Sequence, residues 1–95
     1  MRINIKENFP NDYISREAGE KLREEILKYS KEKEAIHIDF NQVQIASTSF
    51  MDEAFAKLAL EGWTEKEFNQ RVRLENMDSR DEKVLKQVCK YRGLI

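Results

Sequence analysis

Three consecutive hydroxyl residues, Ser47, Thr48 and Ser49, are the strongest candidates for a functional site in this chain of 95 residues. A hydroxyl oxygen can cap a helix by accepting a hydrogen bond from a backbone N–H group, and a hydroxyl can also receive a phosphate or bind a partner. Capping needs only one of the three side chains. The sequence therefore leaves open both a structural role and a functional role for the cluster.

Few other residues could support catalysis or hold a metal. The sequence contains one histidine, one cysteine and three glycines, and it lacks metal-binding Cys/His spacing, a Cys–His pair and a phosphate loop. His37 lies between two isoleucines, where we expect a hydrogen-bonded structural histidine, and Cys89 is expected to be a small, buried or half-buried apolar residue. We expect no catalytic residue, no metal site, no cofactor and no enzymatic activity.

An acidic pair, Asp52 and Glu53, follows the hydroxyl cluster. We place both residues in the first turn of a helix, where the helix dipole favours negative charge. Adjacent helical residues point in different directions, so a shared acid/base site is not expected. Together with Phe50 and the three hydroxyl residues, the pair is a candidate surface for a partner.

The helix that presents this surface is predicted to begin after Ser49, our preferred N-cap, and to end at Gly62, with Trp63 folding back onto its last turn. Its core-facing residues recur at spacings of three and four, namely Met51, Ala54, Phe55, Leu58 and Ala59. The preceding apolar run, Ala35 to Phe40, is predicted to be a buried central strand with Asp39 near its carboxyl end. Val43 and Ile45 are expected to point back to the core.

The remaining segments alternate between strand and helix patterns. We predict a strand at Ile3 and Ile5 that Phe9 could extend, a helix from Arg16 to Lys31, a short helix after Thr64, and a strand from Arg71 to Met77. The last helix is predicted to start with a capping box at Ser79 and to end at Gly93, with an apolar face of Val84, Leu85, Val88 and Tyr91.

This order predicts an α/β fold, β-α-β-α-(short α)-β-α, with a mainly parallel sheet of three or four strands and helices packed against it. A fourth strand near residues 9–13, or a partner subunit that completes the sheet, stays open. Gly19 should cost its helix about 1 kcal/mol relative to Ala. It indicates either close contact with another backbone or a tolerated exposed site.

Composition limits the classes of partner and the cellular location. The chain has 17 basic and 18 acidic residues and a formal net charge of −1, so we expect neither nucleic acid nor an anionic membrane as a partner. A protein partner or a small ligand is expected instead. A single cysteine and an N-terminus without an apolar run favour the cytoplasm, and the length favours one domain spanning residues 1–95.

Two short motifs resemble the STAS-like family DUF4325 over about residues 3 to 92. The first is Ser15-Arg16 followed by Gly19 and Leu22, and the second is Ser-Phe-Met-Asp-Glu at residues 49–53, preceded by Asp39-Phe40 and Val43. The resemblance implies a STAS-like fold. It also implies kinship with STAS antagonists of anti-sigma factors, in which a histidine-kinase-like ATPase phosphorylates the residue after the Asp of an Asp-Ser-Ser/Thr-Gly loop.

Aligned with that loop, Ser47 stands at the Asp position, Thr48 at the phosphoacceptor and Phe50 at the Gly. The resemblance thus implies a bacterial regulatory module that docks a histidine-kinase-like ATPase or anti-sigma-type partner through residues 44–55 and is switched by phosphorylation. One alternative is a sensor of a small molecule or anion at the same helix N-terminus. Another is a homodimer formed through an open sheet edge.

Overall fold

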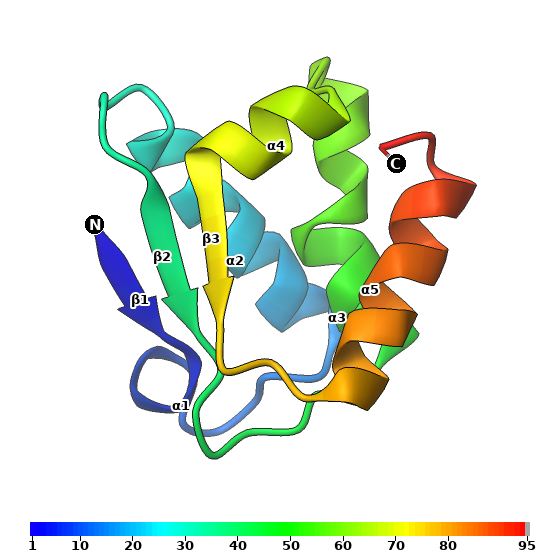
Figure 1. The fold of residues 1–95 in the computed structure, drawn as a ribbon. Coiled ribbons are helices and arrows are strands. Elements are labelled where there is room, and N and C mark those ends of the chain that lie inside the picture. The colour runs from blue at the N-terminus through cyan, green and yellow to red at the C-terminus, as the bar shows by residue number, and fades with distance from the viewer. Residues whose placement is uncertain (95) are drawn as a thin grey trace.

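The structure of the protein is a computed structural model that describes residues 1–94. Its elements in chain order are β1 (Arg2–Asn4), α1 (Ile5–Asn8), α2 (Arg16–Tyr29), β2 (Ile36–Asp39), α3 (Thr48–Ala54), the 3-10 helix η1 (Ala56–Glu61), α4 (Glu65–Arg71), β3 (Val72–Glu75) and α5 (Ser79–Tyr91) (Figure 1). None of these helices is long and apolar enough to cross a membrane, within residues 1–94.

The three strands form a parallel sheet in the order β1-β2-β3, so β2 is central as predicted. Ile38 on β2 lies opposite Ile3 on one side and Leu74 on the other. Parallel neighbouring strands need long crossover connections. Helices occupy the connection from β1 to β2 and the connection from β2 to β3. The fold class is therefore α/β, as the alternation of patterns predicted. No fourth strand forms near residues 9–13, and in the described part of the chain β1 and β3 are the sheet edges.

The two faces of the sheet differ in polarity. Ile36 and Ile38 are fully buried on the face that α2 covers, whereas His37 and Asp39 alternate with them on the opposite face (Figure 1). His37 Nδ1 lies 2.9 Å from Glu75 Oε2, which confirms the expected hydrogen-bonded histidine. Parallel sheets are usually covered on both faces, so a polar outer face is a distinctive feature of this sheet.

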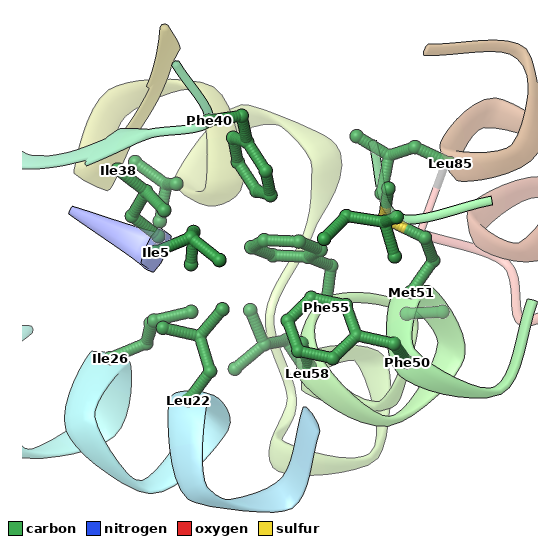
Figure 2. Packing of buried hydrophobic residues seen from close by; sticks show 14 of the residues in the cluster. Ile5, Leu22, Ile26, Ile38, Phe40, Phe50, Met51, Phe55, Leu58 and Leu85 are labelled. Atoms are coloured by element: carbon green, nitrogen blue, oxygen red, sulfur yellow. The ribbon is translucent and has the colours of Figure 1, made fainter. Parts of the chain in front are cut away.

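The core lies between the sheet and the helices. Phe55 is near its centre, with its ring centroid 6.2 Å from that of Phe40 and 6.0 Å from that of Phe68. Figure 2 shows residues of the sheet side, such as Ile38 and Phe40, facing Leu22 and Ile26 of α2 across this space. Val43 and Ile45 are buried, as predicted.

The predicted first strand is too long. Ile5 is not part of β1 but begins α1, because the Asn4 side chain caps that helix by accepting a hydrogen bond from the Glu7 N–H at 2.9 Å. Phe9 follows α1 and therefore does not extend the strand. Ile5 is nevertheless fully buried, so the apolar pattern identified a core residue in the wrong element.

The predicted helix up to Gly62 is interrupted. α3 ends at Ala54, and η1 continues the chain to Gly62, which has the left-handed φ of 84° that the prediction required. Ala54, Phe55 and Ala56 are all fully buried. The buried run extends back to Phe50 within α3, so α3 and η1 both pack inside the fold. Trp63 is half-buried, and its backbone N–H donates a hydrogen bond to the Leu58 carbonyl, as expected of a residue that folds back onto the last turn.

Two predictions about the last helix are wrong. Its N-cap is Asp78, which accepts a hydrogen bond from the Asp81 N–H at 2.8 Å, so Ser79 is the first helical residue. Tyr91 is 89% exposed instead of packed in the core. The buried face repeats every four residues through Asp81, Leu85 and Cys89, which leaves Tyr91 on the outside. The expected burial of Cys89 is confirmed.

Candidate functional site

The N-cap of α3 is Ser47, not the predicted Ser49. The Ser47 hydroxyl accepts a hydrogen bond from the Phe50 N–H at 3.1 Å and donates one to the Ile14 carbonyl at 2.6 Å. Its backbone is extended, as an N-cap requires, and the preceding Ala46 has a positive φ of 48°. The hydroxyl cluster therefore divides into a capping Ser47, an exposed Thr48 and a half-buried Ser49 within the helix.

The loop before α3 is held by Asp81 from α5. Asp81 is fully buried, and its carboxylate accepts hydrogen bonds from the backbone N–H groups of Ile45 at 2.8 Å and Ala46 at 2.9 Å. The sequence did not predict this contact. An acidic residue in the first turn of a helix is already explained by the capping box, so nothing pointed to a distant partner for Asp81. No local pattern distinguishes a capping-box carboxylate from one that binds a distant loop.

Asp52 and Glu53 are buried carboxylates that form ion pairs with the same arginine. They lie beyond the first turn of α3, because the helix begins at Thr48, and both are at most 8% exposed. Arg16 Nη1 is 3.2 Å from Asp52 Oδ2 and 2.8 Å from Glu53 Oε2. The prediction that both charges lie in the first turn of the helix is therefore wrong. One guanidinium at the start of α2 reaches both side chains.

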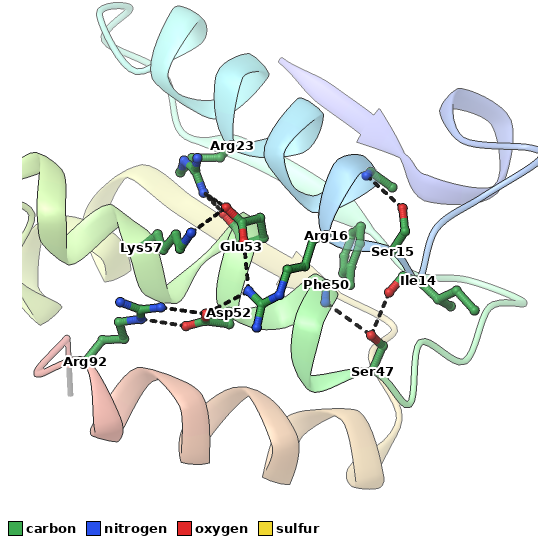
Figure 3. Close-up of polar contacts among 11 residues, drawn as sticks. Ile14, Ser15, Arg16, Arg23, Ser47, Phe50, Asp52, Glu53, Lys57 and Arg92 are labelled. Atoms are coloured by element: carbon green, nitrogen blue, oxygen red, sulfur yellow. Dashed lines mark hydrogen bonds and ion pairs between the residues drawn. The ribbon is translucent and has the colours of Figure 1, made fainter.

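Three further cations complete this group, which we call the arginine–carboxylate cluster: Arg16, Arg23, Asp52, Glu53, Lys57 and Arg92 (Figure 3). Arg92 binds Asp52 through Nε at 2.7 Å and Nη2 at 2.8 Å. Lys57 Nζ lies 2.7 Å from Glu53 Oε1, and Arg23 donates to both the side chain and the carbonyl of Glu53. The cluster joins α2, α3 and the residues after α5.

These contacts determine the protonation of the carboxylates. The hydrogen bond from Arg92 is the main cause that lowers the pKa of Asp52 below its usual value, against the effect of burial. Burial alone would raise the pKa of Glu53, but hydrogen bonds from Lys57, Arg16 and Arg23 outweigh it and lower this pKa to about 2. Both carboxylates are therefore charged at neutral pH. Burial, with the nearby Asp52 charge, raises the pKa of the Cys89 thiol to about 12, so Cys89 is not a reactive thiolate.

The two sequence motifs meet at this cluster. Ser15 caps α2 by accepting a hydrogen bond from the Ala18 N–H at 3.0 Å, as predicted, and Arg16 follows it. At Gly19, an added Cβ would lie 2.7 Å from the Phe50 carbonyl oxygen and 2.8 Å from the Glu53 Cβ. The interpretation of Gly19 as a point of close contact is confirmed. The small residue lets α2 approach α3 closely enough for Arg16 to reach Asp52 and Glu53.

The other predicted site residues are not on the exposed surface of the loop. The Phe50 side chain is fully buried in the core. Asp39 is half-buried at the end of β2, where it accepts hydrogen bonds from the Asn41 N–H at 2.9 Å and the Asn76 side chain at 2.8 Å. These bonds lower the pKa of Asp39 and give the residue a structural role. Within residues 1–94, no three His, Cys, Asp or Glu side chains are grouped to hold a metal ion.

Comparison with known families assigns the chain. Residues 18–82, more than half of its length, match the model of the family described as "STAS-like domain of unknown function (DUF4325)". Ser15 and Arg16 lie just before the matched segment, whereas Gly19, Asp52 and Glu53 lie within it. No curated protein matches the chain, and no solved structure does. The family match and the parallel α/β fold agree, and the chain belongs to the STAS-like DUF4325 family.

Proposed function

We propose that this protein is a non-enzymatic bacterial regulatory module that docks a protein partner through the docking loop, residues 44–49. The partner class that the family resemblance supports is a histidine-kinase-like ATPase or an anti-sigma-type protein. Thr48 is the position that the partner contacts and phosphorylates. Ser47, Asp52 and Glu53 support this surface from within the fold.

The observation that carries the proposal is a loop that is exposed at its tip and anchored at its base. Gln44, Ala46 and Thr48 are exposed, whereas Val43 and Ile45 between and before them are buried. The Asp81 carboxylate and the Ser47 hydroxyl hold the same segment through hydrogen bonds to distant residues. A surface that is already ordered loses little conformational entropy when it binds, which favours a docking role over a flexible connection.

Thr48 can be altered without disturbing these anchors. Its side chain is exposed at the first position of α3, where added negative charge is compatible with the helix dipole. Thr48→Glu should therefore leave the thermal melt close to that of the wild type. If a partner binds Thr48, the added charge and bulk should weaken the complex by about tenfold, which corresponds to ~1.4 kcal/mol.

The test compares binding of a candidate histidine-kinase-like ATPase to the wild type, to Thr48→Glu and to Ser79→Glu. Ser79 provides a matched control, because it is also an exposed hydroxyl residue at the first position of a helix. We expect weaker binding for Thr48→Glu alone and, with ATP, a mass increase of one phosphate that Thr48→Ala abolishes. Equal affinity of all three proteins, with no phosphate on residues 47–49, would contradict the proposal.

A further inference from the structure

We propose that a pocket between α2, α3 and α5 binds the phosphate group of a small phosphate ester. This pocket, which we call the arginine pocket, has a volume of about 450 Å³. Arg16 and Arg92 line it together with Thr48, Gln87 and Tyr91. It is separate from the N-terminal amides of α3, where Ser47 already occupies the Phe50 N–H.

Charge balance favours an anion in this pocket. The arginine–carboxylate cluster contains four cations and two carboxylates, and all six side chains are joined by ion pairs of 2.7–3.2 Å. Asp52 is the one carboxylate that lines the pocket, among residues 1–94. The pocket itself is lined by two of these cations, Arg16 and Arg92, and by Asp52, so its lining carries one positive charge in excess. A phosphate monoester, with a charge of about −1.5 to −2 at neutral pH, would be attracted to this excess positive charge.

Both arginines keep hydrogen-bond donors for such a group. Arg16 binds the carboxylates through Nη1 alone, and its side chain is 56% exposed. Arg92 uses Nε and Nη2, so its Nη1 group makes no hydrogen bond within residues 1–94. Figure 3 shows the two guanidinium groups meeting at Asp52. Asp52 thus holds two planar donors side by side, an arrangement that suits phosphate oxygens better than a single flexible lysine would.

The neutral residues of the pocket favour a phosphate ester over inorganic phosphate as the ligand. Thr48, Gln87 and Tyr91 are exposed, so their hydroxyl and amide groups are available to a ligand. Tyr91 is the most exposed large apolar side chain described, at 89%, although it stands beside the paired arginines. An aromatic ring at the edge of an anion site can stack on a flat group of the ligand. We therefore expect an aryl or nucleoside phosphate to bind more tightly than inorganic phosphate.

The test is a titration of ¹⁵N-labelled protein with inorganic phosphate and with phenyl phosphate, followed by NMR at constant ionic strength. We expect saturable shifts at the Arg16 and Arg92 Nε–H groups and at the Thr48 and Tyr91 amides, with stronger binding of phenyl phosphate. Gln87→Glu places a negative charge in the pocket on an exposed side chain, so it should weaken binding by about tenfold while the protein stays folded. Gln70→Glu on α4 is the matched control and should bind like the wild type.

Equal shifts with phosphate and with chloride, or equal affinities of Gln87→Glu and Gln70→Glu, would overturn the site. Phenyl phosphate binding no more tightly than phosphate would overturn the role of Tyr91. Thr48 belongs both to the pocket and to residues 44–49, so the two proposals are told apart by the measurement: the phosphate titration needs no partner protein, and the docking test uses the partner. Ser79→Glu, the control that retains partner binding, should still bind phosphate, and phosphate binding without any partner binding would contradict the docking proposal alone.

Discussion

Arg16 at the start of α2 and Glu53 near the end of α3 are joined by an ion pair of 2.8 Å, across 37 residues of sequence. Glu53 has a side chain only 7% exposed, and it also binds Arg23 and Lys57. A buried carboxylate is stable only when such partners compensate for lost hydration. The ion pair therefore couples the packing of α2 against α3 to the charge state of Glu53.

The first prediction concerns pH. The pKa of Glu53 in the folded protein is about 2, below its ordinary value of 4.5, so its charged form contributes stability above about pH 4.5 that is lost as the pH falls toward 2. Glu53→Gln should be less stable than the wild type at pH 7, by up to about 3 kcal/mol. The difference should shrink between pH 5 and pH 2. Urea denaturation at several pH values measures it, with the exposed Glu20→Gln as control. A difference that stays constant down to pH 3 would contradict the assignment.

The second prediction concerns the contact of α2 with α3 at Gly19. Replacing a helical glycine by alanine normally stabilises a protein by about 1 kcal/mol. Here the new Cβ would lie 2.7 Å from the Phe50 carbonyl oxygen, so Gly19→Ala should instead destabilise by about 1–3 kcal/mol. The sign of the change in the free energy of unfolding decides the question. Glu20→Ala, at the exposed next position, controls for helix propensity, and a stabilised Gly19→Ala would show that the helices can separate at little cost.

The third prediction concerns the anchor of the docking loop. Asp81→Asn keeps the size of the side chain but replaces one accepting oxygen by an NH₂ group facing the Ile45 or Ala46 N–H. We expect a loss of about 1–3 kcal/mol and faster amide exchange at residues 45 and 46. Glu82→Gln makes the same chemical change at the exposed neighbouring residue and should behave like the wild type. Unchanged exchange in Asp81→Asn would mean that the loop is ordered without this carboxylate.

The fourth prediction compares two serines of the hydroxyl cluster. Ser47→Ala removes the N-cap of α3 and the hydrogen bond to the Ile14 carbonyl, so the free energy of unfolding should fall by about 0.5–2 kcal/mol. Ser49→Ala, inside the helix, should be close to neutral. Chemical denaturation of the two variants provides the measurement. A larger loss of unfolding free energy for Ser49→Ala than for Ser47→Ala would indicate that Ser49 is the N-cap, as the sequence pattern predicted.

The fold was largely predictable because its signals are local. The apolar run at Ala35–Phe40, the Ser15 cap and the left-handed Gly62 each depend on a few neighbouring residues, and β2, α2 and the end of η1 lie where these signals place them. The alternation of strand and helix patterns likewise determined the α/β class. Local signals were least reliable at helix starts, where several side chains could serve as the cap and tertiary contacts select among them. Ser47 was selected by its contact with Ile14, and Asp78 rather than Ser79 caps α5.

The candidate site depended on contacts between residues far apart in the chain. The sequence determined that Thr48 is a polar residue beside a helix start and that Gly19 needs an explanation. Only the tertiary structure brought Arg16 and Arg92 to Asp52, and Asp81 to Ile45, each across 35 residues or more. Which cation pairs with which carboxylate depends on how three helices pack, and one-dimensional spacing carries no information on that packing. The exposed docking loop and the arginine pocket are therefore products of the assembled fold.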